Sequence, residues 1–254
     1  MKFGIRTSGA AVLLLASSLA AFLVANAADK KDKTKPEPLQ TVDSGSFGVF
    51  IKGQRVATEN FKIEQQSGAS TIKSQFKATA GPDAVSQKSE LDMTTNGELL
   101  RYEWNQNSGA SLSVFPSNDF LMERITASGT GKPAEQPFLM PNTTAILDNN
   151  FFVHREVLAW RYLGAACKAE GGSLKCQQGG AQFGVLVPQD HISISVRMEL
   201  VGKEKVNIRG AERELLRLNL TGEGFEWALW VDDRDQFKLI QVAIPADNTE
   251  VVRD

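Results

Sequence analysis

The sequence contains few residues suited to thiol, imidazole or metal chemistry. Its 254 residues include only two cysteines and two histidines. Neither histidine has a second histidine or a run of acidic residues at ligand spacing, so we predict no metal ion and no cofactor. We also predict no catalytic residue, because the G-x-S-x-G nucleophile elbow is absent and Gly129-Thr130-Gly131-Lys132 lacks the leading glycine of a phosphate-binding loop.

An excess of positive charge is also absent. The chain carries 28 Lys and Arg against 30 Asp and Glu, a formal net charge of −2. This balance excludes nucleic-acid binding through a basic surface, and the even spread of charge argues against disorder. The length is ample for a sizeable hydrophobic core.

Residues 1–27 have the three parts of a secretory signal peptide. Lys2 and Arg6 precede an apolar run from Ala10 to Val24, and Ala25-Asn26-Ala27 fits the small-residue cleavage pattern. We therefore predict cleavage after Ala27 and a periplasmic or secreted protein. The alternative is an uncleaved N-terminal membrane anchor, because Gly9 to Ala28 is almost long enough to cross a bilayer.

The next segment is charged and proline-rich. Ala28 to Pro38 has no periodic apolar position, which predicts a flexible leader over residues 28–43. It is either an exposed leader beyond the cleavage site or a spacer reaching from an anchor. We expect one folded domain over residues 44–254.

Alternation of apolar and polar residues predicts β strands over most of this domain. Ile192 to Leu200 alternates strictly, and the same period recurs over 206–208, 216–220, 225–231 and 240–244. Gly202-Lys203 and Gly222-Glu223-Gly224 predict turns between these runs. Such spacing is typical of an antiparallel meander.

The N-terminal half follows the same pattern more loosely. Strands are predicted over 47–51, 55–63, 71–78, 86–94, 99–105, 111–115 and 119–126, with turns at Lys52-Gly53 and Thr95-Asn96-Gly97. The predicted fold class is mainly β: a large curved antiparallel sheet or open barrel with one covering helix.

That helix is predicted near residues 143–163. Five residues with spacings of four, three, four and four form one helical face: Leu147, Phe151, His154, Leu158 and Tyr162. Asn142 or Asp148 would provide the N-cap, and Gly164 would end the helix. His154 lies on the apolar face, so we expect a packed or hydrogen-bonded core histidine rather than a catalytic one.

The two cysteines flank a short segment that can form a chain-reversing turn. Gly171-Gly172-Ser173 would place Cys167 opposite Cys176 on a hairpin, which predicts a structural disulfide in an exported protein. A redox pair is the alternative, but it usually requires C-x-x-C at a helix start.

Aromatic and apolar residues offer the remaining candidate site. The possible lining of an apolar ligand site comprises Leu100, Tyr102, Trp104, Phe225, Trp227 and Trp230. The first three are predicted to share one strand face, whereas Trp227 and Trp230 point to opposite faces. Core packing is the alternative role for each tryptophan.

Two segments carry a resemblance to known proteins. Asn96-Gly97-Glu98-Leu99-Leu100-Arg101-Tyr102 is a turn followed by a strand with a G-x-L-x-x-Y pattern. Leu229-Trp230-Val231-Asp232-Asp233, leading to Lys238-Leu239-Ile240, is an aromatic strand, an acidic turn and a return strand. In these segments the chain resembles exported bacterial β proteins of unknown function, whose open or curled sheet is shared by the periplasmic lipoprotein carriers and their outer-membrane receptors. The resemblance implies a fold and a compartment, with lipid or lipoprotein binding by analogy.

The leading hypothesis is therefore a non-enzymatic binder or carrier of a hydrophobic envelope ligand, either a lipid or a lipoprotein. The alternative is a structural or protein-interaction module of the cell envelope that uses its sheet edges to contact a protein partner. A hydrolase is a third hypothesis, which His154 or His191 beside a carboxylate in a cleft would support.

Overall fold

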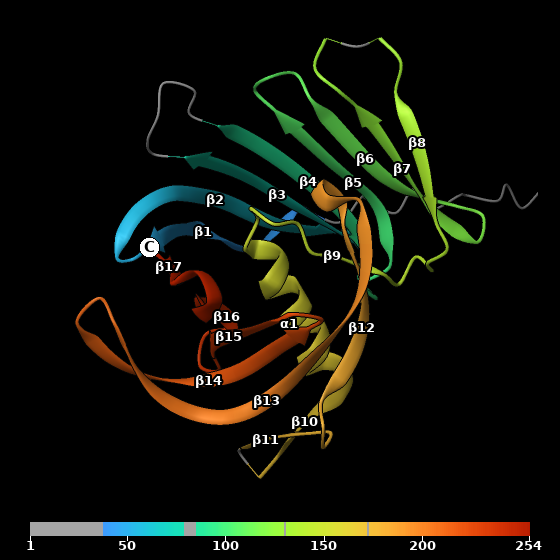
Figure 1. The fold of residues 1–254 in the computed structure, drawn as a ribbon. Helices are drawn as coiled ribbons and strands as arrows, with labels where there is room; N and C mark the ends of the chain where they lie inside the picture. Colours follow the sequence, from blue (N-terminus) through green and yellow to red (C-terminus); the bar gives the residue numbers. More distant parts are fainter. Residues whose placement is uncertain (1–37, 79–84, 130, 172) are drawn as a thin grey trace, which may run out of the picture. The chain divides into compact units, whose positions relative to one another are not determined.

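The computed structural model describes residues 38–78, 85–129, 131–171 and 173–254. Most of this part of the chain forms β strands joined by tight turns, with one α-helix (Figure 1). The predicted signal peptide and residues 28–37 of the predicted leader lie outside the described residues. The described part contains no helix long and apolar enough to cross a membrane.

The N-terminal half is an antiparallel meander, in which each strand pairs with the next. Its strands are β1 (Gln40–Ile51), β2 (Gln54–Gln66), β3 (Ala69–Ala78), β4 (Ser86–Thr94), β5 (Leu99–Gln106), β6 (Ser111–Ser117), β7 (Phe120–Thr126) and β8 (Ala134–Phe138). Lys52 and Gly53, between β1 and β2, both have positive φ, as a two-residue hairpin turn requires.

The C-terminal half contains the helix and a second meander. Its elements are β9 (Ala145–Ile146), α1 (Val153–Ala166), β10 (Cys167–Glu170), β11 (Ser173–Cys176), β12 (Ala181–Val187), β13 (Ile192–Ile208), β14 (Ala211–Gly222), β15 (Phe225–Asp232), β16 (Lys238–Ile244) and β17 (Thr249–Arg253). Two 3₁₀ turns, η1 (Pro188–Asp190) and η2 (Pro245–Asp247), join β12 to β13 and β16 to β17.

The two meanders form one sheet because the first and last strands pair. The order is β8-β7-β6-β5-β4-β3-β2-β1-β17-β16-β15-β14-β13-β12-β9, with Phe47 opposite Arg253 and Val49 opposite Val251 at the central junction. Every pairing is antiparallel except that of β12 with β9. The sheet curves around α1 without closing into a barrel (Figure 1). The predicted fold class, a large open antiparallel sheet with one helix, is confirmed.

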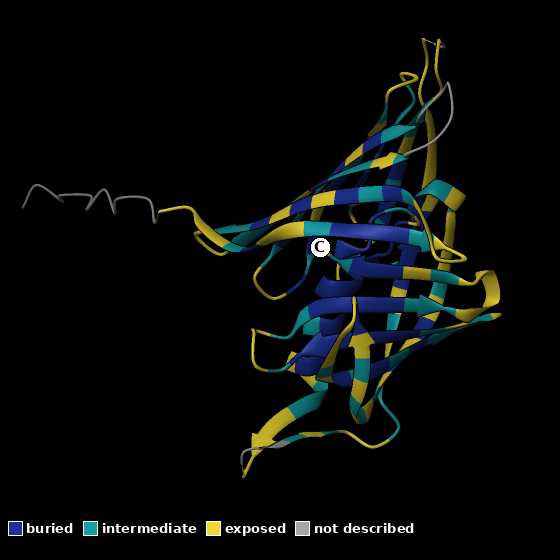
Figure 2. Cartoon of the chain, turned by 90° about the vertical axis from the view of Figure 1, so that its left-hand side faces the viewer, coloured by how far each residue is buried: buried dark blue, intermediate teal, exposed yellow. Residues whose placement is uncertain are grey.

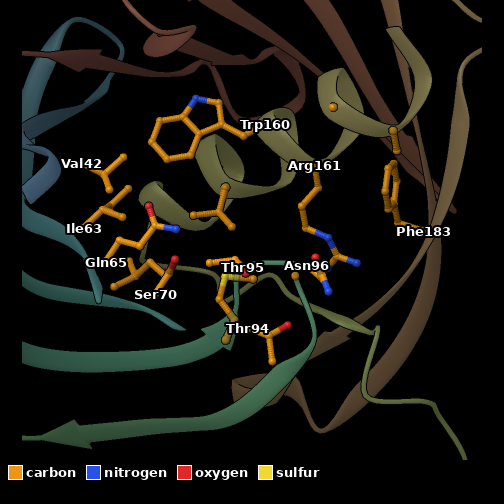
Figure 3. A pocket seen from close by; sticks show the side chains of 16 residues that line it. Val42, Ile63, Gln65, Ser70, Thr94, Thr95, Asn96, Trp160, Arg161 and Phe183 are labelled. Atoms are coloured by element: carbon orange, nitrogen blue, oxygen red, sulfur yellow. The ribbon is translucent and has the colours of Figure 1, made fainter. Parts of the chain in front are cut away.

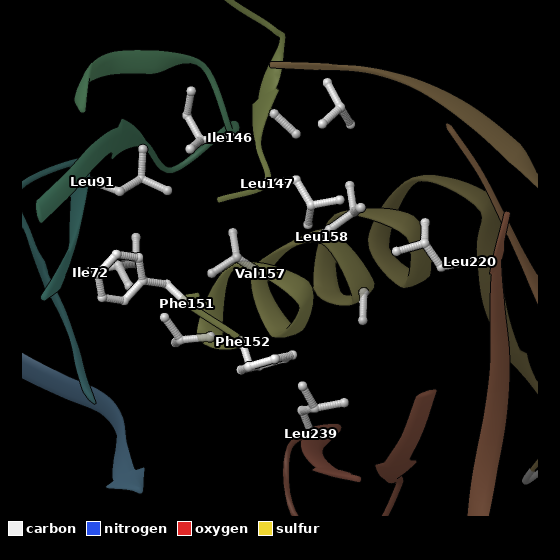
Figure 4. Packing of buried hydrophobic residues seen from close by; sticks show 14 of the residues in the cluster. Ile72, Leu91, Ile146, Leu147, Phe151, Phe152, Val157, Leu158, Leu220 and Leu239 are labelled. Atoms are coloured by element: carbon white, nitrogen blue, oxygen red, sulfur yellow. The ribbon is translucent and has the colours of Figure 1, made fainter. Parts of the chain in front are cut away.

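The main core lies between α1 and the concave face of the sheet. Leu158 on the helix and Ile72 and Leu91 on the strands are almost completely buried (Figure 4). Burial is concentrated in the middle of the strands, whereas the strand tips are exposed (Figure 2). At about 25 cal/mol per Å² of apolar surface removed from water, this packing is the main favourable contribution to folding.

A smaller core covers the opposite face of the C-terminal strands. Leu229 and Val231 of β15 belong to the main core, whereas Ala228 and Trp230 belong to this second cluster. Side chains alternate between the faces of a strand, so β15 is covered on both sides. The prediction that Trp227 and Trp230 point to opposite faces is therefore confirmed.

The helix begins ten residues later than the predicted start at residue 143. Ala145 and Ile146 pair with β12 as an edge strand, and Asp148 accepts a hydrogen bond from the Asn150 backbone N–H in a turn (3.1 Å). The N-cap is Phe152, not Asn142 or Asp148, and the helix passes through Gly164 to Ala166. The five residues of the predicted helical face are nevertheless all buried, although two of them precede the helix.

Three further local predictions were wrong. Gly202-Lys203 is not a turn: Gly202 lies at a register shift within the single long strand β13. Leu100 does not share the face of Tyr102, because a register shift near Leu99 turns Leu99 inward and leaves Leu100 46% exposed. Residues 40–43 belong to β1 rather than to the flexible leader.

The predicted disulfide is present. Cys167 and Cys176 are directly opposite each other on the hairpin of β10 and β11 and are bonded to each other. The hairpin follows directly from the C-terminal end of α1, so the disulfide closes a short loop at the end of the helix.

Candidate functional site

A mainly apolar cleft of about 540 Å³ lies between α1 and the ends of β2, β3 and β4. Its volume lies within the range of roughly 300–1,000 Å³ that is usual for small-molecule sites. Four parts of the chain line the cleft: strands β1 to β4, the turn after β4, the helix α1 and strand β12. The strands β1 to β4 contribute Val42, Ile63, Gln65, Ser70, Ile72, Met93 and Thr94, and the turn contributes Thr95, Asn96 and Gly97. The helix contributes Val157, Trp160, Arg161, Gly164 and Ala165, and β12 contributes Phe183.

One side of the cleft is apolar. Figure 3 shows the Trp160 ring opposite Val42 and Ile63. The indole N–H of Trp160 donates a hydrogen bond to the Phe237 carbonyl (2.9 Å), so the ring is held in place while its polar atom is satisfied. Gly164 adds open space, because a Cβ at this position would contact nothing within 4 Å.

The opposite side of the cleft carries its only charged lining residue among those described, Arg161. The side chain extends toward Asn96 (Figure 3), and Nη2 donates a hydrogen bond to the Thr143 carbonyl (2.7 Å). The second terminal nitrogen, Nη1, is buried and has no hydrogen-bond partner among the described residues. Burial lowers the pKa of Arg161. An unsatisfied buried donor costs about 1–3 kcal/mol, so the single bond to Thr143 leaves the Arg161 guanidinium with unused hydrogen-bonding capacity.

The turn after β4 allows the Arg161 side chain to approach closely. Gly97 has φ +84°, and a Cβ added there would lie 3.0 Å from Arg161 Nε. The absence of a side chain at Gly97 therefore permits both the left-handed backbone conformation and the close approach of the Arg161 guanidinium. The predicted turn at Thr95-Asn96-Gly97 is confirmed by the hydrogen bond from the Gly97 N–H to the Thr94 carbonyl (2.9 Å).

The helix that forms the cleft is held at its N-terminus by a strand residue. Glu59 of β2 accepts hydrogen bonds from the backbone N–H groups of Phe152 (2.6 Å) and Val153 (3.3 Å) and from the Ser74 hydroxyl (2.7 Å). It thereby satisfies donors that a local N-cap side chain would ordinarily satisfy. Burial nevertheless dominates and raises the pKa of Glu59 to about 7, although these bonds and Arg155 favour the ionised form.

A buried polar cluster continues from this point into the core. Arg155 is 1% exposed and donates to the carbonyls of Asp148 and Phe151, and the Tyr102 hydroxyl donates to the Asp148 carboxylate. Burial raises the pKa of Asp148 to about 6. His154 accepts a hydrogen bond from the Asp148 N–H at Nδ1 (3.3 Å), and burial followed by the Arg155 charge lowers its pKa to about 3. His154 is thus a neutral core histidine, as predicted.

An ionic cluster fixes the other side of the helix to the central strands. Arg253 of β17 binds both carboxylate oxygens of Asp43 (2.7 and 2.6 Å) and one oxygen of Glu156 (3.2 Å). Burial, reinforced by the neighbouring Asp43, raises the pKa of Glu156 well above its usual range. Because both clusters join helix to sheet, they position the helical wall of the cleft.

The six residues predicted as a ligand lining lie elsewhere, and the cleft is lined by other residues. Leu100 is exposed, and Tyr102 is fully buried in the polar cluster. Trp104, Phe225 and Trp227 are partly buried against the main core, and Trp230 belongs to the second core. Phe225 packs against Trp227 with ring centroids 5.0 Å apart, and Trp227 also contacts the Arg155 guanidinium (4.8 Å).

His191 is paired with a carboxylate outside the cleft. Its Nδ1 lies 2.8 Å from Glu123 Oε2, and burial raises the pKa of Glu123 although His191 opposes this. Among the described residues, no hydroxyl or thiol group hydrogen-bonds to the other ring nitrogen of His191. In the same part of the chain, no group of three or more His, Cys, Asp or Glu side chains is arranged to hold a metal ion.

The sequence contained one signal for the cleft that the periodicity argument did not use. Val157, Trp160, Arg161 and Gly164 recur at helical spacing and form a second face beside the core-facing stripe. The helix prediction named only the face of Leu147, Phe151, His154, Leu158 and Tyr162, so this second face had no assigned role.

No protein-family model matches the chain, and no curated protein and no solved structure matches it. The resemblance to the lipoprotein carriers therefore stays a prediction, and the cleft is the feature that points to a function.

Proposed function

We propose that this chain is a non-enzymatic binder or carrier that holds the acyl part of a lipid or lipoprotein in the cleft between α1 and strands β2–β4. The observation that carries the proposal is the cleft itself, with about 540 Å³ of space and an apolar wall formed by Trp160, Val42 and Ile63. Together with the predicted export signal, this supports a role in the cell envelope.

The architecture around the cleft supports ligand binding. The sheet is open, and Glu59 at the start of α1 and Arg253 beside Glu156 hold the helix against its concave face. The cleft is therefore lined by elements that stay in place without a ligand. A preformed apolar cleft binds with little ordering cost, which favours affinity for small hydrophobic molecules.

The alternative, a protein-interaction module that uses its sheet edges, has less support. β8 at one end carries Pro137 and Glu135, both exposed, and β9 at the other end has only two residues. Proline, charge and short length all discourage the addition of another strand.

Binding of the neutral fluorescent probe N-phenyl-1-naphthylamine tests the proposal. Gly164→Phe places a ring in open space at the helical wall, whereas Gly164→Ala adds only a methyl group. Neither change introduces backbone strain, because Gly164 lies within the helix. Alanine and phenylalanine both have a higher helix propensity than glycine, alanine by up to about 1 kcal/mol. Both variants should therefore fold.

We expect the wild type and Gly164→Ala to bind the probe with increased fluorescence and Gly164→Phe to bind it at least tenfold more weakly. Thermal unfolding of all three proteins checks that the fold is intact. Absence of probe binding by the wild type, or equal binding by folded Gly164→Phe, would contradict the proposal.

A further inference from the structure

Arg161 is an isolated cation in an otherwise uncharged cleft. Among the described residues, no carboxylate lies within 4.0 Å of its guanidinium, whereas Arg155 lies near Asp148 and Glu59 and Arg253 binds Asp43. Its described contacts are the Thr143 carbonyl and the ring of Phe183, 5.9 Å from Cζ. A partly desolvated cation without a counter-ion is a ready partner for an anionic ligand.

The rest of the lining does not oppose an anion. No Asp or Glu is among the described residues of the cleft, and its polar groups are the uncharged side chains of Gln65, Ser70, Thr94, Thr95 and Asn96. A ligand at Arg161 therefore meets one positive charge, several neutral hydrogen-bonding groups and an apolar wall opposite.

We propose that the ligand is a single-chain fatty acid, with its carboxylate bound to the Arg161 guanidinium and its alkyl chain against Trp160, Val42 and Ile63. This inference rests on the proposed function, which it deepens by naming the headgroup. The charged end and the apolar wall lie on opposite sides of the cleft, as an amphiphile requires (Figure 3).

The charge count favours a carboxylate over a phosphate monoester. Arg161 supplies one positive charge, and one of its terminal nitrogens already donates to the Thr143 carbonyl. A carboxylate, with a single negative charge, leaves the site neutral. A phosphate monoester carries roughly −1.5 to −2 at pH 7, which would leave uncompensated charge in a desolvated cleft.

The test compares ligands with the same twelve-carbon chain at pH 8: dodecanoate, 1-dodecanol, dodecyl phosphate and dodecylammonium, each displacing N-phenyl-1-naphthylamine. The proteins are wild type, Arg161→Met, Arg161→Lys and Arg101→Met. Arg101 is an exposed residue of β5 outside the cleft, paired with Glu103, so its variant controls for the loss of one positive charge.

We expect the wild type to bind dodecanoate more tightly than the other three ligands. Arg161→Met should lose about 10- to 100-fold in dodecanoate affinity, the usual effect of removing a hydrogen bond between charged groups, and should keep its dodecanol affinity. Arg161→Lys should retain most of the dodecanoate affinity, and Arg101→Met should behave as wild type.

Equal dodecanoate affinity of the wild type and Arg161→Met would overturn the inference, as would an equal loss in Arg101→Met. Tighter binding of dodecyl phosphate or dodecylammonium than of dodecanoate would assign a different ligand and overturn it too. In each of these cases binding of the probe and of dodecanol leaves the proposed function standing. If neither the probe nor any of the four ligands binds the wild type, both proposals fail.

Discussion

The buried carboxyl group of Glu59 should make the free energy of unfolding decrease as the pH rises, and the isosteric substitution Glu59→Gln should remove this contribution. The pKa of Glu59 is raised from 4.5 to about 7 in the folded protein, because burial outweighs the hydrogen bonds from Ser74, Phe152 and Val153. The folded state therefore holds this proton more tightly than the unfolded state. The resulting stabilisation is fully present below pH 4.5 and is lost as the pH rises through about 7.

The magnitude follows from the difference between the two pKa values. One pKa unit corresponds to about 1.4 kcal/mol, so the interval from 4.5 to about 7 is equivalent to about 3 kcal/mol of unfolding free energy. Glu59→Gln preserves the size of the side chain and cannot titrate. The free energy of unfolding of the wild type minus that of Glu59→Gln should therefore fall by about 3 kcal/mol between pH 4.5 and pH 8.

Urea unfolding of both proteins at intervals from pH 4.5 to pH 8 measures this difference. Contributions from Asp148, His154 and the other titrating groups are present in both proteins, so the subtraction removes most of their effect. Ser74→Ala is a useful additional variant. Loss of the Ser74 hydrogen bond to the ionised carboxylate should raise the pKa of Glu59 further, so the loss of stability should occur at higher pH. A difference that stays constant over the whole range, or that rises with pH, would refute the reasoning.

Two further predictions concern the disulfide and the core histidine. Replacement of Cys167 and Cys176 by serine should lower the free energy of unfolding by about 2–3 kcal/mol, the loop-entropy value for a separation of nine residues, and an unchanged urea midpoint would contradict this. The His154 ring should stay neutral from pH 8 down to pH 5 because its pKa is lowered to about 3; NMR signals of its ring protons that titrate near pH 6.5 would contradict this.

Local periodicity predicted most of the strands but missed others, including β8, β9 and β12, and the Gly171-Gly172-Ser173 turn between the cysteines predicted the disulfide hairpin. The alternation of Phe225, Trp227, Leu229 and Val231 reflects a strand with different neighbours on its two faces, and this is a property of neighbouring residues. The register shifts beside Leu99 and Gly202 could not be predicted in the same way. At Gly202 a turn and a bulge use the same residue type, and only the partner strand decides between them.

The start of the helix depended on contacts that are distant in the sequence. Glu59 binds the helix N-terminus across a separation of 93 residues, and β9 pairs with β12 rather than extending the helix. A search for a local N-cap therefore pointed to the wrong residues. The cleft was missed for a related reason: its lining comes from the sheet, one turn and the helix, and only the curvature of the sheet brings them together.

Binding of an alkyl chain in the cleft beside Trp160 should be visible in the indole N–H signals of the four tryptophans. In ¹H–¹⁵N spectra assigned with Trp160→Phe and Trp230→Phe, titration with dodecanoate should shift the Trp160 signal. The Trp230 signal, from a residue in the second core whose indole donates to Glu204 (3.0 Å), should not move. An unmoved Trp160 signal at saturating dodecanoate would show that the alkyl chain does not bind in this cleft.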